Sequence, residues 1–284
     1  MIEVKDLYFK YSEKDAFSID HISFKINKGE IFGFLGPNGA GKTTVQAILT
    51  GLLKQQGGTV LYQGKSIEEQ KEDFYNKIGV SFEFPNLYGK LTGYENLKYF
   101  AGLFSVPTVD PNFLLDLVGL KDITNKRTEQ YSKGMKQRAV FARALINNPE
   151  ILYLDEPVSG LDPTTARNIK QVIQKEKEKG TTIFLATHNM FVAEELCDEV
   201  AFINEGKIVT IDTPKNLKLQ YGSKSVEVEY KMNEHVRKEL LFLEKKDDKS
   251  KLQNIIGNHQ IITMHSKEAS LEEIFIKVTG RGLI

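Results

Sequence analysis

The glycine-rich stretch at residues 36–43, G-P-N-G-A-G-K-T, constrains this chain more than any other feature. It follows the apolar run 31–35 and precedes residues 44–51, where apolar side chains recur at helical spacing. In a strand, loop and helix of this kind, the glycines let the loop bend so that its backbone N–H groups point inward, and the helix start adds the positive end of a dipole. We therefore predict a nucleoside triphosphate site. An ordinary glycine-rich turn between a strand and a helix is the alternative.

A pair of carboxylates is the second candidate for chemistry. Asp155 and Glu156 directly follow the apolar run 151–154, which has the pattern of a buried strand. Such a strand can deliver Asp155 to a metal shell and place Glu156 beside a γ-phosphate, where it can polarise water. Lys42 would then lie against the β- and γ-phosphates, and the Thr43 hydroxyl would ligate Mg²⁺. An acidic pair also ends strands by chance, so further motifs must decide.

The composition is that of an ordinary globular protein, with 284 residues of which 40% are hydrophobic and 27% charged. This length can hold one large α/β core and a small appendix. Lys+Arg and Asp+Glu are both 38, so overall charge gives no reason to expect a nucleic-acid partner. The single cysteine, Cys197, excludes an internal disulfide and is expected to be buried. We predict no signal peptide and no membrane-spanning segment.

Periodicity divides the chain into a core and an appendix. Alternating segments near the start predict an antiparallel β layer, helical spacing dominates about residues 86–147, and later strands separated by helices predict a parallel sheet. After a linker at 221–223 the pattern becomes that of a small α+β unit, so the predicted domains are 1–221 and 222–284. The appendix is expected to contain strands at 225–230 and 260–265, a charged helical stretch at 234–246 and a helix at 271–278.

Three more motifs complete a recognisable set. They are Y-S-K-G-M-K-Q-R at 131–138, S-G-L-D at 159–162, and His188 at the end of a predicted strand. Together with the phosphate loop and the acidic pair, they resemble the ATPase subunit of an ATP-binding cassette (ABC) transporter over roughly residues 2–215. The resemblance implies an α/β P-loop NTPase cassette with a RecA-like parallel sheet core, an antiparallel β layer and a helical subdomain.

The resemblance also implies roles for single residues. Tyr11 would stack on adenine, unless it is only a packed surface tyrosine. Ser132 and Gly134 would contact the γ-phosphate of a nucleotide bound to a second subunit, and Ser132 is independently a good helix N-cap. Asp162 would lie at the dimer seam, and His188 would grip the γ-phosphate beside the catalytic Glu156. The residues implied to hold the phosphates are Gly36, Pro37, Asn38, Gly39, Ala40, Gly41, Lys42, Thr43 and Thr44.

The motif at 131–135 departs from the family's usual Leu-Ser-Gly-Gly-Gln. Tyr131, Lys133 and Met135 replace the first, third and fifth members, whereas the anion-contacting Ser132 and Gly134 remain. We therefore expect the phosphate contact to survive. Lys133 either adds a positive charge near the partner's phosphate or points to solvent.

Glu83 is a second departure, because the family usually has a glutamine here that senses Mg²⁺ and couples to the membrane subunit. A carboxylate can still take part in the metal shell. We expect normal nucleotide binding with altered coupling.

The implied function is a Mg²⁺-dependent ATPase that dimerises on ATP, as a homodimer, and powers a separate membrane permease from the cytoplasmic face of the cell membrane. Stretches at 86–97, 131–135 and 270–280 are similar to bacterial drug, antibiotic and sodium exporter ATPases, which favours export of a drug-like or other small substrate. The alternatives are an importer ATPase and a soluble ABC ATPase, although the sequence shows neither a long coiled-coil insertion nor a second cassette. A GTPase is also disfavoured, since no Asn-Lys-x-Asp motif is present.

Overall fold

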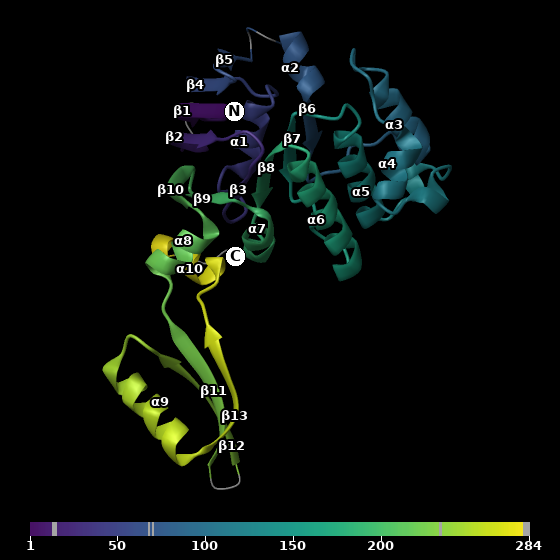
Figure 1. Cartoon of the computed structure of the whole chain (residues 1–284). Helices are drawn as coiled ribbons and strands as arrows, with labels where there is room; N and C mark the ends of the chain where they lie inside the picture. Colours follow the sequence, from purple (N-terminus) through teal and green to yellow (C-terminus); the bar gives the residue numbers. More distant parts are fainter. Residues whose placement is uncertain (13–15, 68, 70, 233–234, 281–284) are drawn as a thin grey trace. The chain divides into compact units, whose positions relative to one another are not determined.

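The computed structural model describes residues 1–12, 16–67, 69, 71–232 and 235–280 (Figure 1). It forms two compact units, one covering Met1–Ile211 and the other beginning at Asp212. Helix α8 (Pro214–Tyr221) falls in the second unit, where it packs on helix α10 (Leu271–Thr279). The division into domains after residue 221 stays a prediction.

The first unit is built on a six-stranded sheet with the order β10-β9-β3-β8-β7-β6. Neighbours from β9 to β6 are paired in parallel. Every residue of β3, β7 and β8 is buried, as expected for parallel strands covered on both faces. The strands are β3 (Ile31–Leu35), β6 (Ile78–Ser81), β7 (Ile151–Asp155), β8 (Thr182–Thr187), β9 (Glu199–Asn204) and β10 (Lys207–Asp212).

A second sheet confirms the predicted antiparallel layer. Its strand order is β2-β1-β4-β5, and its strands are β1 (Ile2–Phe9), β2 (Ile19–Ile26), β4 (Gly57–Tyr62) and β5 (Lys65–Ser66). Buried and more exposed residues largely alternate along β2, so one face of this layer supplies apolar side chains. Phe24 of β2 stacks on Phe32 of β3 with ring centroids 5.4 Å apart, which joins the two sheets in one core.

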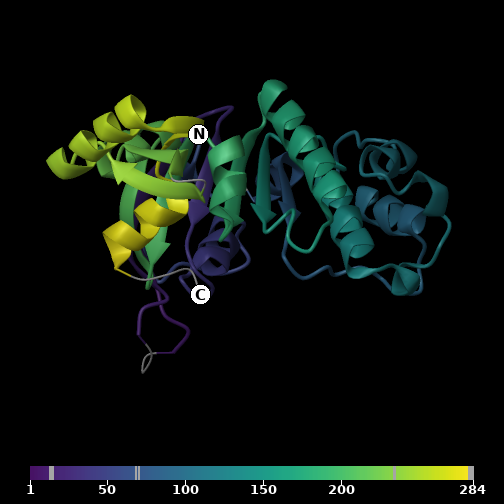
Figure 2. The same cartoon turned by 90° about the horizontal axis from the view of Figure 1, so that it is seen from below.

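Helices cover the parallel sheet and form a group beside it. The helices of the first unit are α1 (Lys42–Leu49), α2 (Lys71–Lys77), α3 (Gly93–Ala101), α4 (Pro111–Leu117), α5 (Lys133–Ala144), α6 (Pro163–Glu178) and α7 (Met190–Leu196), with 3₁₀ turns η1 (Lys121–Ile123) and η2 (Thr128–Gln130). Helices α3, α4 and α5 pack on one another and gather to one side of the sheet in both views (Figures 1 and 2). Cys197, just after α7, is buried as expected.

The second unit contains a three-stranded antiparallel sheet, β12-β11-β13, and one further helix. Its elements are β11 (Ser225–Met232), β12 (His235–Phe242), α9 (Lys246–Asn258) and β13 (Gln260–Lys267). Ile255 of α9 packs with Val228 and Tyr230 of β11 in a small core of its own. The strands predicted at 225–230 and 260–265 and the helix at 271–278 are confirmed.

The predicted helical stretch at 234–246 was wrong. Residues 235–242 form strand β12, which pairs with β11 from Met232↔His235 to Ser225↔Phe242, and the helix begins only at Lys246. The charged run has no clear strand alternation, but pairing with β11 and burial of Leu241 decide its conformation. Glu234 lies outside the described residues. Among the described helices, none is both long enough and apolar enough to cross a bilayer.

Candidate functional site

The phosphate loop leaves β3 at Gly36 and enters α1 at Lys42. Gly39 and Gly41 have φ angles of 78° and 109°, in the region that glycine adopts without strain. A Cβ atom at Gly36 would collide with the backbone oxygen of Ile203. All three glycines are therefore needed for the path of this loop.

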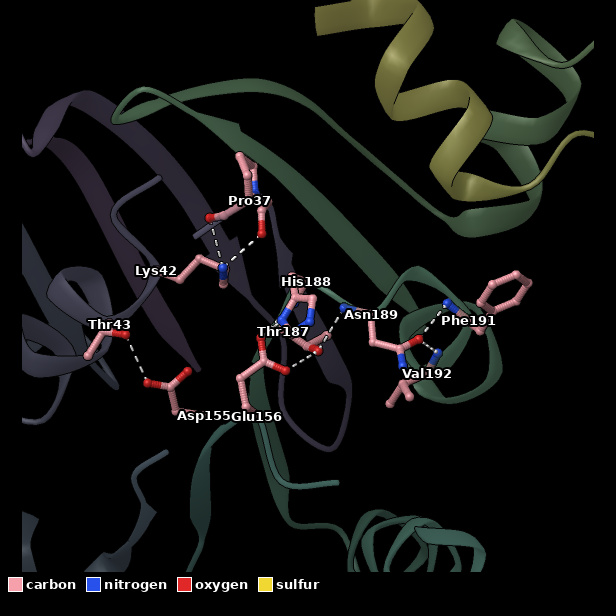
Figure 3. A network of polar contacts seen from close by, with 11 residues as sticks. Pro37, Lys42, Thr43, Asp155, Glu156, Thr187, His188, Asn189, Phe191 and Val192 are labelled. Atoms are coloured by element: carbon pink, nitrogen blue, oxygen red, sulfur yellow. Dashed lines mark hydrogen bonds and ion pairs between the residues drawn. The ribbon is translucent and has the colours of Figure 1, made fainter. Parts of the chain in front are cut away.

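Lys42 folds back over the loop that precedes it (Figure 3). Its Nζ donates to the carbonyl oxygens of Gly36 at 2.8 Å and Pro37 at 3.0 Å. Burial lowers the pKa of Lys42, and the charges of Glu156 and Asp155 oppose that shift. A phosphate oxygen would be a stronger partner for this ammonium group than two neutral carbonyls, because hydrogen bonds between ionised groups are the stronger ones.

Asp155 ends β7 directly opposite the start of α1. Its Oδ2 accepts a hydrogen bond from the Thr43 hydroxyl at 2.9 Å. Burial raises the pKa of Asp155 to about 6; the charges of Glu156 and Glu83 add to the rise, while the bond from Thr43 and the charge of Lys42 oppose it. The charge of Lys42 thus does not offset the burial of this carboxylate, and a bound cation beside it would stabilise its ionised form.

The oxygen atoms at this point suit Mg²⁺. That ion usually takes one or two protein carboxylates and completes its shell with phosphate oxygens and water. Thr43, Asp155 and Glu83 line one cavity of about 420 Å³ beside the loop. The described residues contain no group of three or more acidic, histidine or cysteine side chains that could hold a metal alone. A bound Mg²⁺ would thus depend on the phosphates for part of its shell.

Glu156 is held more firmly than an exposed carboxylate would be. Its φ of 48° is unusual for a residue with a side chain, and its N–H donates to the Ala186 oxygen at 2.9 Å. Its Oε1 accepts from the His188 backbone N–H at 2.7 Å and lies 2.6 Å from Nδ1 of the same histidine. Its Oε2 accepts from the Thr187 hydroxyl at 2.8 Å (Figure 3). Both oxygens of the carboxylate are therefore held by residues at the end of β8.

Thr187 is a residue that the sequence analysis missed. It ends β8, and the register that pairs Asp155 with Ala186 places Glu156 and Thr187 next to each other. A hydroxyl residue directly before His188 was visible in the sequence. Its contact with Glu156 was not, because the register of two strands far apart in the chain cannot be read from one sequence.

Tyr11 lies at the rim of the same cavity, where its hydroxyl is 3.0 Å from Oγ1 of Thr44. Tyr11 is 64% exposed, and its adenine role stays a prediction. Ser18 also lines the cavity and was missed. Its backbone oxygen faces Gly41 at a distance that leaves no room for a Cβ.

The cavity brings most of the predicted residues together. Its lining consists of Tyr11, Ser18, Asn38, Gly39, Gly41, Lys42, Thr43, Thr44, Glu83, Asp155 and Glu156. Gly36, Pro37 and Ala40 form the rest of the loop, and His188 is connected to the cavity through Glu156.

Ser132, Gly134 and Asp162 are not among the residues that line the cavity. Ser132 begins α5, and its Oγ accepts from the Met135 N–H at 3.2 Å, which confirms its expected role as an N-cap. A Cβ at Gly134 would lie 3.2 Å from the side chain of Leu161. The motif at 131–138 and the motif at 159–162 therefore pack against each other within one chain. These residues form a second surface, separate from the phosphate loop.

Asp162 begins α6 in a similar way. Its Oδ1 accepts from the N–H groups of Thr164 and Thr165, and the hydrogen bonds with Thr165 are the main cause of its lowered pKa. The structure gives Asp162 a capping role, and its place at a dimer seam stays a prediction. Lys133 is exposed to solvent in the single chain.

The burial of Asp155 predicts a pH-dependent change in stability. Its pKa is about 6 in the folded chain against an ordinary 3.8. The folded state therefore binds more protons between these values, and the unfolding free energy falls as pH rises through this window. At pH 7.5 without metal, the charged carboxylate should cost about 3 kcal/mol.

Asp155→Asn keeps an oxygen acceptor for Thr43 and should raise the unfolding free energy at about pH 7.5, with the gain shrinking toward about pH 4. Urea denaturation in the presence of a chelator measures this. Asp162→Asn is the matched control, since the pKa of Asp162 is shifted the other way and asparagine also caps helices. An Asp155→Asn protein no more stable than the wild type at the higher pH would show that the charge is already compensated.

Comparison with known proteins agrees with this geometry. The family model described as "ABC transporter" matches residues 19–159. A fluoroquinolones export ATP-binding protein of Mycobacterium tuberculosis (strain H37Rv) is 47% identical over 284 residues, which cover 100% of this chain and 94% of that protein. The lantibiotic transport ATP-binding protein SrtF of Streptococcus pyogenes is 37% identical over 209 residues, covering 74% of this chain and 89% of SrtF.

Solved structures show the same architecture. An ATP-binding subunit of an ABC transporter matches with a TM-score of 0.71 and 27% identity, covering 78% of this chain and 93% of that one. A dimeric ATP-binding cassette in a post-hydrolysis state, bound to ADP and Pi, matches with a TM-score of 0.68 and 26% identity, covering 75% of this chain and 98% of that one. The chain therefore belongs to the ABC transporter family, as one of its ATPase cassettes.

Proposed function

We propose that this chain is the ATPase subunit of an exporter, in which two cassettes close on ATP and drive a separate membrane permease. The observation that carries the proposal is the separation of two surfaces on one chain. The phosphate loop lines the cavity, whereas Ser132 and Gly134 lie at the start of α5 and do not. A second copy, turned to face the first, would bring its α5 N-terminus to the nucleotide, where the helix dipole favours a phosphate.

Export is supported by what the relatives are called. They include a fluoroquinolones export protein, a lantibiotic transport protein and a probable multidrug ABC transporter protein of Escherichia coli. We infer a drug-like or other small substrate, selected by the permease. The matched cassette cbiO1 of Clostridium perfringens is part of the complex cbiONQ, which supports a multi-subunit assembly.

We place this chain in the cytoplasm, on the inner face of the membrane, as a homodimer without a nucleic-acid partner.

Each group in the cavity has a task in this proposal. Lys42 would exchange the carbonyls of Gly36 and Pro37 for phosphate oxygens. Mg²⁺, held by Thr43 and Asp155 with Glu83 nearby, would neutralise charge on those oxygens. Tyr11 would stack on the adenine ring.

Glu156 would orient a water molecule for attack on the γ-phosphate and accept its proton. A carboxylate has about four acceptor sites, so the bonds from Thr187 and His188 leave capacity for the water. His188 would also contact the γ-phosphate. The fixed geometry of Glu156 matters because a water must be aligned with the bond that breaks.

Glu156→Gln removes the base and keeps the size of the side chain. We expect steady-state ATP turnover to fall by on the order of 100- to 1000-fold, with nucleotide binding retained. The control is Glu205→Gln, another glutamate with positive φ, 49°, which should turn over like the wild type. Turnover near the wild-type rate in Glu156→Gln would exclude Glu156 as the key carboxylate.

Glu83→Gln tests the second departure from the family pattern. Removing this charge should lower the pKa of Asp155, so Mg²⁺-dependent nucleotide binding should persist to lower pH than in the wild type. At neutral pH, nucleotide affinity should stay the same while the ATPase rate with the permease present, and transport, should change. If rate, transport and pH profile all match the wild type, position 83 is only a spacer.

A further inference from the structure

Tyr131 is buried, with 4% of its surface exposed, where the family usually has leucine. Its hydroxyl donates to the Ile123 carbonyl oxygen at 2.9 Å. The same hydroxyl lies so close to Gly93, the first residue of α3, that a Cβ at position 93 would collide with it. The tyrosine and the glycine are therefore matched to each other across two segments far apart in the sequence.

The turn that precedes Tyr131 is fastened to the same end of α3. Asn96 is fully buried, and its Nδ2 donates to the Thr92 oxygen at 2.9 Å and to Thr128 Oγ1 at 3.4 Å. The Thr128 N–H donates to the Leu91 oxygen at 2.9 Å, and the Tyr131 N–H donates to the Thr128 oxygen at 3.1 Å. Residues 128–131 thus depend on the first turn of α3 for their position.

Ser132 has no such support of its own. Within the described residues, its hydrogen bonds go to its own helix, to Met135 and Lys136. The position of the Ser132 hydroxyl therefore depends on the position of the chain at the N-terminus of α5. Tyr131 is the residue directly before Ser132, so a contact that fixes Tyr131 also fixes the entry to α5.

We propose that Tyr131 is a positioning residue for Ser132, because its hydroxyl bonds the chain entering α5 to Ile123 of η1 and packs against Gly93 at the first turn of α3. This inference rests on the proposed function, in which Ser132 contacts the nucleotide of the partner copy. A leucine at position 131 could not donate to Ile123 and would leave space beside Gly93. A catalytic group displaced by about 1 Å can lose about 100-fold in rate.

Tyr131→Phe removes only the hydroxyl. We expect turnover at saturating ATP to fall at least about 10-fold, while nucleotide affinity of the phosphate loop is unchanged. Tyr62→Phe is the matched control, since Tyr62 is equally buried and donates to Glu150 at 2.9 Å. It should lose comparable stability and keep its turnover. Equal turnover losses in the two variants, or no loss in Tyr131→Phe, would overturn the inference.

Gly93→Ala provides a second test of the contact. It should lower turnover in the wild-type background, because the new methyl group displaces the Tyr131 hydroxyl. Combined with Tyr131→Phe it should add little, since the nearest remaining ring atom, Cζ, would be 3.4 Å away. Independent, multiplicative losses in the double variant would contradict the proposed contact.

Mixed dimers separate this inference from the function on which it rests. Lys42→Ala and Ser132→Ala, each inactive alone, should regain turnover when mixed, because one intact loop then faces one intact signature. Adding Tyr131→Phe to the Lys42→Ala chain should weaken that recovery, whereas adding it to the Ser132→Ala chain should not. No recovery in the parent mixture would overturn the proposed function. Recovery with no such asymmetry would overturn only the role of Tyr131.

Discussion

The parallel register of β3, β8 and β7 is the constraint on which the site depends. Parallel strands present their carboxyl ends at one edge of a sheet, and ligands of α/β proteins bind outside that edge. Here β3 delivers the phosphate loop, β7 delivers Asp155 and Glu156, and β8 delivers Thr187 and His188. A slip of one residue between β7 and β8 would separate Glu156 from both of its partners. The buried side chains of these strands hold the register, and the register in turn fixes the geometry of the polar groups at the strand ends.

Among the described residues, the negative charges that act on Asp155 outnumber the positive ones. The charges of Glu156 and Glu83 add to the raised pKa of Asp155, and the charges of all three carboxylates oppose the lowering of the pKa of Lys42. The raised pKa of Asp155 and the lowered pKa of Lys42 both reflect burial without sufficient charged partners. An anionic nucleotide with a divalent cation supplies both missing signs of charge together.

Features contained in one contiguous segment could be predicted from the sequence, whereas contacts between segments far apart in the sequence could not. Residues 36–43 and 155–156 were predicted because each set is contiguous and its strand context is local. The contact of Thr187 with Glu156 and the fit of Tyr131 to Gly93 needed strand register and helix packing, which one sequence does not contain. Residues 235–242 were mistaken for helix because pairing with β11, and not the local pattern, makes them a strand. The local pattern therefore sufficed to single out the loop and the acidic pair, but not the contacts that position Glu156 and Tyr131.

We propose that each chain carries one half of each of two ATP sites and hydrolyses ATP only when it faces a second copy. Turnover per chain, measured for the isolated wild-type protein over a wide range of concentrations at saturating Mg²⁺–ATP, tests it most directly. We expect turnover per chain to rise with concentration and to level off once dimers dominate, in step with an ATP-dependent increase in particle mass. A constant turnover per chain down to concentrations at which only single copies are detected would contradict it.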